Sequence, residues 1–230
     1  MGIQKKTKRA SGSKPIDMPK TNSLAAEQYR SIRTNLNFTM PHSNVRTILF
    51  TSADNGEGKT TTALNIAIVY AESGKKVLLV DGNMRKPSVH HFFGIASRNG
   101  FSSLLLKKGE LLDTVKRTDI VGLEVLPCGH VPSNPAELLG TAALEQLMTE
   151  MKKYYDVIIF DSPSILTIAD SKILANKCDG TVLVVSSGKT DKKRIVKAKE
   201  ALISSKATII GVILNNHELE NNQYYEDYHQ

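Results

Sequence analysis

The sequence predicts an α/β fold, a single domain in which a mostly parallel sheet is flanked by helices. Two observations support this. Short runs rich in Val, Ile and Leu alternate with longer stretches of helical periodicity, and these runs are apolar almost throughout. Such strands are typical of a parallel sheet that is covered on both faces. The predicted strands are residues 47–51, 77–81, 123–126, 157–161, 181–185 and 209–214.

Four stretches have the periodicity of helices. Ser23 suits an N-cap before the first stretch, and Gly74 follows the second as a C-cap glycine would. Pro135 suits the start of the third stretch, because proline is well accepted in a first helical turn. The predicted helices are residues 23–38, 60–73, 135–154 and 191–204.

The charge distribution divides the chain into three parts. The net charge is +7, but the basic residues crowd the first twenty positions, where only Asp17 opposes them. We therefore predict a basic flexible arm at 1–22, a folded domain at 23–217 and a flexible, tyrosine-rich tail at 218–230. We interpret the arm as a solvated segment, with docking to a surface or partner as the alternative, and predict no nucleic-acid partner.

The sequence predicts a location in the cytoplasm. It has no run of about 18 apolar residues, so any membrane attachment would come from a partner. Its start lacks the apolar segment of a signal peptide. Cys128 and Cys178 lie far apart and lack metal-ligand spacing, which favours a reducing compartment.

Residues 53–60 form a phosphate-binding motif. Their sequence, Ala-Asp-Asn-Gly-Glu-Gly-Lys-Thr, matches G-x-x-x-x-G-K-[ST] with Ala53 in place of the first glycine. Because the motif lies between a predicted strand and helix, backbone N–H groups and the positive helix end can hold phosphate oxygens. Lys59 can reach the β- and γ-phosphates, and Thr60 offers a hydroxyl to Mg²⁺. We therefore predict a P-loop NTPase-like fold. The predicted nucleotide-binding residues in the loop are Asn55, Gly56, Glu57, Gly58, Lys59, Thr60 and Thr61.

Two carboxylates end predicted strands and complete the expected metal site. Asp161 ends the strand 157–161, where a Walker B aspartate holds Mg²⁺ directly or through water. Asp81 ends the strand 77–81, from which a carboxylate could take a proton from an attacking hydroxyl or water. Thr60, Asp81 and Asp161 are the predicted metal residues, and Arg85 is a candidate for binding phosphate.

These motifs together resemble a known family. The loop 53–60, the stretch Asp-Gly-Asn-Met-Arg-Lys-Pro at 81–87, Phe-Asp-Ser-Pro at 160–163 and the tyrosine-rich terminus are similar to those of the cytoplasmic bacterial tyrosine kinases of capsule and exopolysaccharide synthesis. The resemblance covers residue 23 to the C-terminus. It is strongest to the Gram-positive form, in which the kinase is a separate chain activated by a transmembrane modulator.

The resemblance implies a role for each residue of the site. Lys59 and Thr60 would bind ATP·Mg²⁺, and Asp81 would serve metal binding and activation of the tyrosine hydroxyl. The family usually has a second aspartate two residues after the first, where this chain has Asn83, which cannot act as a charged ligand or base. The predicted catalytic set is Lys59, Asp81, Asn83, Arg85 and Asp161.

The resemblance also implies partners and substrates. An E-x-x-R-x-x-R helix that joins subunits into a ring is matched by Glu27, Arg30 and Arg33. The chain would phosphorylate its own tail in trans, and its modulator would recruit it to the inner face of the plasma membrane. A cognate tyrosine phosphatase would reverse the phosphorylation. The predicted phosphorylation sites are Tyr224, Tyr225 and Tyr228.

One further residue and two alternatives complete the predictions. Asn215 follows the last strand, where related P-loop proteins recognise the base with an asparagine. A first alternative is an ATPase of the MinD/ParA type, which positions division sites or segregates DNA. Asp54 stands where such proteins carry a signature lysine, which counts against them. A second alternative is an ATP-binding ring scaffold in which Asn83 has impaired catalysis.

Overall fold

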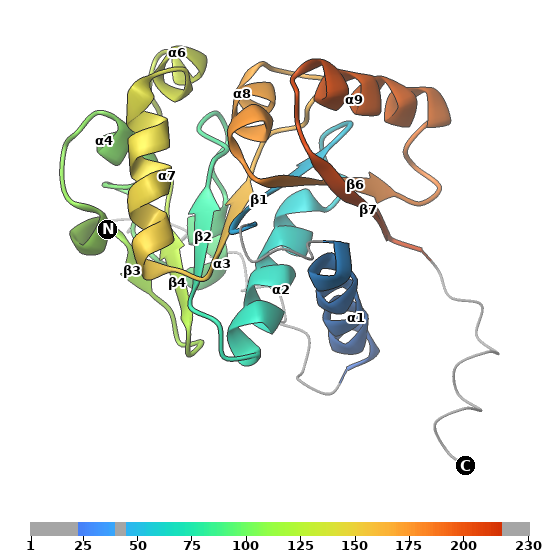
Figure 1. Cartoon of the computed structure of the whole chain (residues 1–230), viewed down its shortest axis with the longest axis horizontal. Helices are drawn as coiled ribbons and strands as arrows, with labels where there is room; N and C mark the ends of the chain where they lie inside the picture. The colour runs from blue at the N-terminus through green and yellow to red at the C-terminus, as the bar shows by residue number, and fades with distance from the viewer. Residues whose placement is uncertain (1–22, 40–44, 218–230) are drawn as a thin grey trace, which may run out of the picture.

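A seven-stranded sheet crosses the centre of the molecule in the computed structural model, which describes residues 23–39 and 45–217 (Figure 1). The strand order is β3-β4-β2-β5-β1-β6-β7, and all neighbours pair in parallel except β3, which is antiparallel to β4. The predicted α/β class with a mostly parallel sheet is therefore confirmed. The predicted arm and tail lie outside the described residues.

All six predicted strands are present, with ends that shift by at most one residue. The sequence does not predict β3, because two residues are too few to show an alternation. The strands are β1 (Thr47–Ser52), β2 (Val77–Asp81), β3 (Lys116–Arg117), β4 (Leu123–Leu126), β5 (Val157–Asp161), β6 (Gly180–Ser186) and β7 (Ile209–Asn215).

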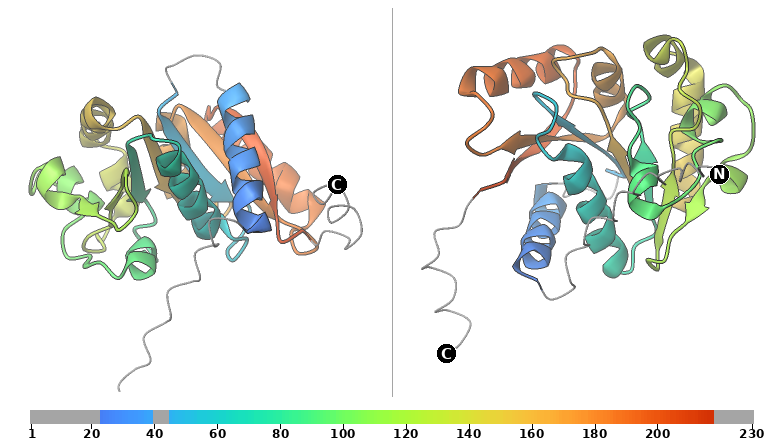
Figure 2. Two further views of the ribbon diagram at one scale, coloured as in Figure 1. Left: turned by 90° about the horizontal axis from the view of Figure 1, so that it is seen from below. Right: turned by 180° about the vertical axis from the view of Figure 1, so that it is seen from behind.

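Helices cover both faces of the sheet (Figures 1 and 2). Consecutive residues of a strand point to opposite faces, so Ile48 and Leu49 of β1 belong to different hydrophobic clusters. One cluster contains residues of α1–α3, and the other contains residues of α4–α9. The helices are α1 (Leu24–Thr39), α2 (Lys59–Glu72), α3 (Val89–Phe93), α4 (Phe101–Leu105), α5 (Leu111–Thr114), α6 (Pro135–Leu139), α7 (Ala142–Tyr154), α8 (Asp170–Lys177) and α9 (Lys192–Ser204).

The predicted helix 135–154 is wrong as a single element, because it is broken between α6 and α7. Thr141 has extended backbone with φ −79° and ψ 157°, and its carbonyl accepts a bond from Leu144 N at 3.2 Å, as an N-cap residue does. The other predicted helices are present. Ser23 Oγ accepts from Ala26 N at 3.2 Å, and Gly74 has φ 83° after α2, which confirms both predicted caps.

The sheet register brings the predicted site together. Asp161 at the end of β5 is paired with Asp81 at the end of β2 and with Phe50 near the end of β1. The loop that follows β1 therefore opens beside both carboxylates, at the edge where parallel α/β sheets bind ligands. No helix among the described residues is long and apolar enough to cross a bilayer.

Candidate active site

The phosphate loop connects the end of β1 to the first residue of α2. Gly56 and Gly58 have φ values of 76° and 88°, a left-handed conformation that favours glycine. A Cβ at Gly58 would also lie 1.9 Å from Asn215 Nδ2, so the Asn215 amide would have to move. Lys59, at the start of α2, is buried at 8% exposure, and Thr61 stands on the same first turn.

Thr60 and Asp161 form the part of the site that fits a metal ion. Thr60 Oγ1 donates to Asp161 Oδ2 at 2.7 Å, while Asp161 Oδ1 is buried without a hydrogen-bond partner among the described residues. Burial, together with repulsion from Asp81, raises the pKa of Asp161 to about 7. A buried carboxylate oxygen without a partner is costly, and a divalent cation would satisfy it. These residues therefore fit Mg²⁺, which binds through few carboxylates plus phosphate and water.

Asp81 organises the loop that follows β2. Its Oδ2 accepts from Ser88 N at 2.9 Å and from Val89 N at 3.0 Å, and its Oδ1 accepts from Asn83 N at 3.3 Å. Its side chain is fully buried, and burial raises its pKa to about 6 despite these bonds. Asp81 thus caps the start of α3 while lying opposite Asp161 across the two strands.

The remaining two residues of the predicted catalytic set point to other partners. Asn83 Oδ1 accepts from Lys86 N at 3.2 Å, so its side chain closes a turn of the same loop. The Arg85 guanidinium binds the fully buried Asp170 carboxylate, with Nε at 2.9 Å and one terminal nitrogen at 3.1 Å. Thr60, Asp81 and Asp161 are therefore brought together, whereas Arg85 is committed to the start of α8.

A segment that sequence reasoning missed holds the outside of the phosphate loop. Lys189 Nζ donates to Gly56 O at 3.0 Å, and Thr190 Oγ1 donates to Glu57 Oε1 at 2.5 Å. Arg194 Nε donates to Asp54 Oδ2 at 2.8 Å as part of a bidentate pair. The segment follows β6 at the same sheet edge as the loop, and that position is the signal that could have revealed it. We call Lys189, Thr190 and Arg194 the loop clamp.

Asn215 and Asn55 lie at the same loop. Asn215 Nδ2 donates to Glu57 O at 3.0 Å, so in this structure the amide fastens the loop from the end of β7. Asn55 Oδ1 accepts from Ser164 Oγ at 3.1 Å, which ties the loop to the segment after β5. Base recognition by Asn215 stays a prediction.

The predicted assembly residues lie on α1, which packs on α2. Arg30 pairs with Glu27 and, at 3.4 Å, with Glu72 of α2. A terminal nitrogen of Arg33 donates to Val69 O at 2.6 Å. The three predicted phosphorylation sites, Tyr224, Tyr225 and Tyr228, lie outside the described residues.

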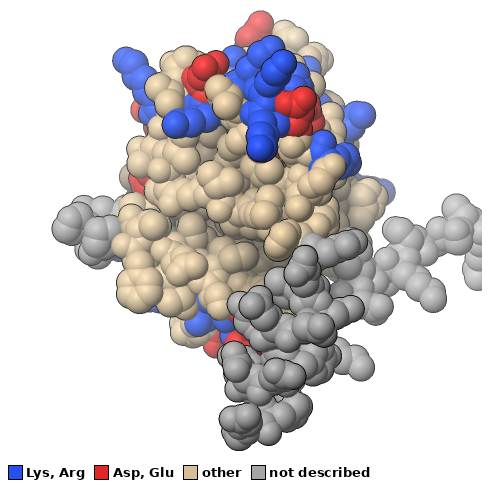
Figure 3. Space-filling view, turned by 90° about the vertical axis from the view of Figure 1, so that its right-hand side faces the viewer, with Lys and Arg blue, Asp and Glu red and all other residues tan. Residues whose placement is uncertain are grey.

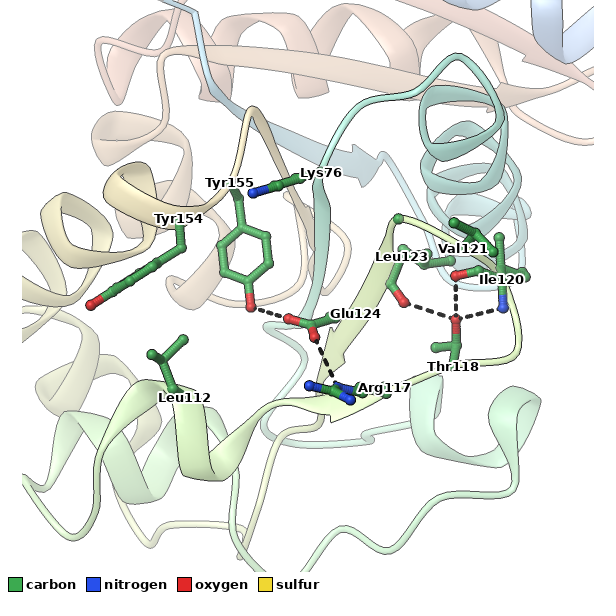
Figure 4. Close-up of a pocket in the computed structure, with 11 residues that line it drawn as sticks. Lys76, Leu112, Arg117, Thr118, Ile120, Val121, Leu123, Glu124, Tyr154 and Tyr155 are labelled. Carbon is green, nitrogen blue, oxygen red and sulfur yellow. Dashed lines mark hydrogen bonds and ion pairs between the residues drawn. The ribbon is translucent and has the colours of Figure 1, made fainter.

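A cavity of about 420 Å³ lies at the opposite edge of the sheet (Figure 4). Its polar groups already satisfy one another, since Tyr155 Oη donates to Glu124 Oε2 at 2.5 Å and Arg117 lies 3.9 Å from the same carboxylate. This hydrogen bond and burial raise the pKa of Tyr155. Lys76 lies just before β2, so the cavity is at the end of the sheet away from the phosphate loop.

Comparisons with known proteins agree with this geometry. The family model described as an AAA domain matches residues 45–190. The tyrosine-protein kinase YwqD of Bacillus subtilis is 46% identical over 213 residues, which cover 93% of this chain and 90% of that protein.

Two solved structures are also similar. The crystal structure of the chimerical protein CapA2B2 has a TM-score of 0.84 at 36% identity, covering 89% of this chain and 90% of that one. The kinase domain of the Escherichia coli tyrosine kinase Etk has a TM-score of 0.83 at 26% identity, covering 94% and 87%. The chain therefore belongs to the bacterial tyrosine-protein kinases, and it carries the phosphate loop and paired carboxylates of that family on an AAA-type α/β core.

Proposed function

We propose that this tyrosine kinase uses ATP and Mg²⁺ to phosphorylate the tyrosine cluster of its own C-terminus in trans, within a ring of identical chains. In this reaction the phenol oxygen of a tail tyrosine bonds to the γ-phosphorus, the bond to the β-phosphate oxygen breaks to leave ADP, and the phenol proton passes to a carboxylate. We further propose that this cycle regulates capsular or exopolysaccharide synthesis.

The observation that carries the proposal is the pairing of Thr60 with Asp161 beside Asp81. A buried carboxylate oxygen without a partner among the described residues and a hydroxyl on the first turn of α2 would be two oxygen ligands for Mg²⁺. The raised pKa of Asp81, about 6, brings this carboxylate closer to the range in which a side chain takes up a proton at neutral pH. We assign metal binding to Thr60, Asp81 and Asp161, and acceptance of the phenol proton to Asp81.

Lys59 and the loop glycines serve the triphosphate in this proposal. Lys59 lies near enough to Asp161 to oppose the rise in the pKa of this carboxyl, and we assign its ammonium to the β- and γ-phosphates. Gly56 and Gly58 leave room for phosphate oxygens at backbone N–H groups, which a side chain would obstruct. Base recognition by Asn215 would require its amide to leave Glu57 O when nucleotide binds.

The proposed substrate and partners follow from the ends of the chain and from α1. Three of the 7 tyrosines lie within five residues of the tail, at 224, 225 and 228. Glu27, Arg30 and Arg33 are the proposed ring contacts. A transmembrane modulator would activate the kinase and recruit it to the inner face of the plasma membrane, and a tyrosine phosphatase would reset it.

An ATP-binding scaffold is the second candidate, and Asn83 is the observation that favours it. Asn83 stands two residues after Asp81 and lacks the charge of a third carboxylate. A MinD/ParA-type ATPase is less well supported, because Asp54, at the signature-lysine position, binds Arg194 of α9.

Mass spectrometry after incubation with ATP and Mg²⁺ separates these candidates. The full chain is assayed together with its modulator, with Lys59→Met as the control that removes the phosphate contact. Phosphate on Tyr224, Tyr225 or Tyr228 supports the kinase cycle. Release of inorganic phosphate without phosphotyrosine supports the ATPase, and nucleotide binding without either product supports the scaffold.

A further inference from the structure

The C-terminal segment leaves the described domain beside the loop that leads into α9. Ser187 N donates to Asn215 O at 2.8 Å, and His217 Nδ1 lies 3.5 Å from Ser187 Oγ. Lys192, the first residue of α9, is only five residues beyond Ser187, so it lies within about 18 Å of it. The segment 218–230 therefore starts beside the loop that leads into α9.

One side of α9 carries lysines without acidic partners. Four lysines of the helix are exposed, and none forms an ion pair with a described residue. Between them lie Val196 and Ile203, exposed at 54% and 57%. Figure 3 shows basic side chains gathered at the end of the molecule where α9 lies, above a broad surface with few charges. We call these residues the lysine face: Lys192, Lys193, Val196, Lys197, Lys199 and Ile203.

The charges that oppose this face within the helix are few. Asp191 caps α9, since its Oδ1 accepts from Lys193 N at 2.6 Å, and Glu200 is the one acidic side chain inside the helix. Arg194 is already held by Asp54 at the phosphate loop. The four lysines thus keep an excess of positive charge that no described neighbour neutralises.

The segment 218–230 has the complementary chemistry. It contains no Lys or Arg, and its apolar side chains are those of Leu219 and the three tyrosines. An extended chain reaches about 3.3–3.6 Å per residue, whereas α9 rises only about 1.5 Å per residue. The 13 residues of the segment are therefore long enough to lie along the whole helix. Its acidic residues are Glu218, Glu220, Glu226 and Asp227.

We propose that the lysine face of α9 docks the C-terminal segment 218–230 of its own chain. Acidic side chains pair with the lysines, while Leu219 and the tyrosines cover Val196 and Ile203. An anionic membrane surface is the competing occupant, but the covalently attached segment has an effective concentration near the millimolar range, which favours the segment.

The docking has a consequence for the kinase cycle, and this consequence alone rests on the proposed function. Each phosphotyrosine adds about 1.5–2 negative charges at pH 7. A phosphorylated segment is therefore held more tightly on its own α9 than an unmodified one. The lysine face then binds the phosphorylated segment and keeps it away from a neighbour's ATP site.

Zero-length cross-linking tests the contact in the full chain without nucleotide. A carbodiimide joins carboxylates directly to lysine amines, and mass spectrometry identifies the pairs. At low salt we expect Glu218, Glu220, Glu226 or Asp227 joined to α9 lysines, in a product that runs as a monomer on a denaturing gel. The yield should fall several-fold at high salt because the lysines are exposed. Since no phosphate transfer is involved, an inactive tail substrate would leave this result unchanged.

Lys199→Glu reverses one charge on the lysine face. Lys108→Glu is the matched control, because it reverses the charge of an exposed lysine in the loop after α4. We expect Lys199→Glu to reduce cross-links at the three remaining α9 lysines several-fold, and Lys108→Glu to leave them unchanged. Tail cross-links spread equally over lysines elsewhere, or found only in dimers, would overturn the proposal. So would absent tail cross-links together with Lys199-dependent binding to phosphatidylcholine vesicles that contain phosphatidylglycerol.

Discussion

Two buried carboxylates face each other at the end of neighbouring strands, and their electrostatics dominate the site at the residue scale. Burial raises the pKa of Asp81 to about 6, and burial with repulsion from Asp81 raises that of Asp161 to about 7. Both values exceed the 3.8 of an ordinary aspartate. The folded protein therefore keeps protons that the unfolded chain has released, so its free energy of unfolding falls as the pH rises from about 4 to about 7.

Asp161→Asn should remove part of this fall in the free energy of unfolding. The amide keeps an oxygen for Thr60 Oγ1 and removes the charge that repels Asp81. Since one unit of pKa shift corresponds to about 1.4 kcal/mol, we expect the ligand-free variant to gain roughly 1–3 kcal/mol at pH 7 and little at pH 4. Urea denaturation across this pH range measures the difference.

The same variant should lose its response to the metal. Mg²⁺ with ATP should raise the Tm of the wild-type protein but have a much smaller effect on Asp161→Asn. Asp179→Asn is a control, because Asp179 lies at the start of β6 and its pKa is lowered by Lys152 and backbone N–H groups despite partial burial. A wild-type protein whose stability rises between pH 4 and 7, with no gain in Asp161→Asn, would contradict this account of the site.

Asn83→Asp tests whether the absence of a carboxylate at position 83 slows phosphorylation. An aspartate at position 83 can accept the same bond from Lys86 N, so the loop should keep its shape. It adds negative charge near the proposed metal, and we expect tail phosphorylation to become about tenfold faster, a barrier change of about 1.4 kcal/mol. Phosphotyrosine formation over time, with Asn83→Ala as the comparison, provides the measurement. An unchanged rate in Asn83→Asp would mean that the second carboxylate is dispensable.

At the scale of elements, the start of α9 and the loop before it brace the phosphate loop from outside. The loop clamp contacts Asp54, Gly56 and Glu57, and Glu57 is almost completely buried at 1% exposure. A phosphate loop that is held in position before nucleotide arrives loses less conformational entropy on binding. We therefore expect the clamp to favour nucleotide binding.

Arg194→Met tests the clamp. The side chains of the Arg194–Asp54 pair are 44% and 40% exposed, so solvent screens their attraction and we expect the loss of the pair to weaken the Kd for ATP only a few-fold. Lys197→Met is the matched control three residues further along α9, because Lys197 is exposed and forms no ion pair with the described residues. Isothermal titration calorimetry measures both, and an equal loss of affinity in the two variants would refute a positioning role for Arg194.

At the scale of the whole molecule, the charged residues of α1 differ in their contacts: some bind α2 of the same chain and others are exposed. Arg33 donates to Val69 O of α2, whereas the Glu27 side chain is 64% exposed and paired with Arg30 on its own helix. We therefore expect the predicted ring contacts to differ in role, with Arg33 stabilising its own subunit and Glu27 contacting a neighbour.

Two variants on α1 should separate these roles. Arg33→Ala should lower the free energy of unfolding by about 1–2 kcal/mol, because it leaves a backbone carbonyl without its partner. Glu27→Lys should leave that free energy within about 0.5 kcal/mol of wild type, as for a surface substitution, while it shifts the assembly toward monomer. Urea denaturation and sedimentation velocity give the two readouts, and a Glu27→Lys chain that sediments as wild type would exclude Glu27 from the interface.

The sequence by itself determined the strands, the phosphate loop and the family, because each depends on local pattern. Apolar runs identify buried strands within one residue of their ends, and the motif 53–60 identifies the loop and the helix after it. Asp81 and Asp161 could be named for the same reason, since each ends such a run. The break at Thr141 was missed because a single extended residue does not disturb the apolar periodicity around it.

Only the tertiary structure decided which side chains meet. Arg85 pairs with Asp170, 85 residues later in the chain, and its role as a phosphate ligand stays a prediction. The loop clamp reaches Asp54 from Arg194 across 140 residues of sequence, and no periodicity encodes such a contact. The local sequence pattern determines which residues form a strand or loop. Contacts between side chains far apart in the sequence depend on the order of the strands in the sheet, and therefore on the whole fold.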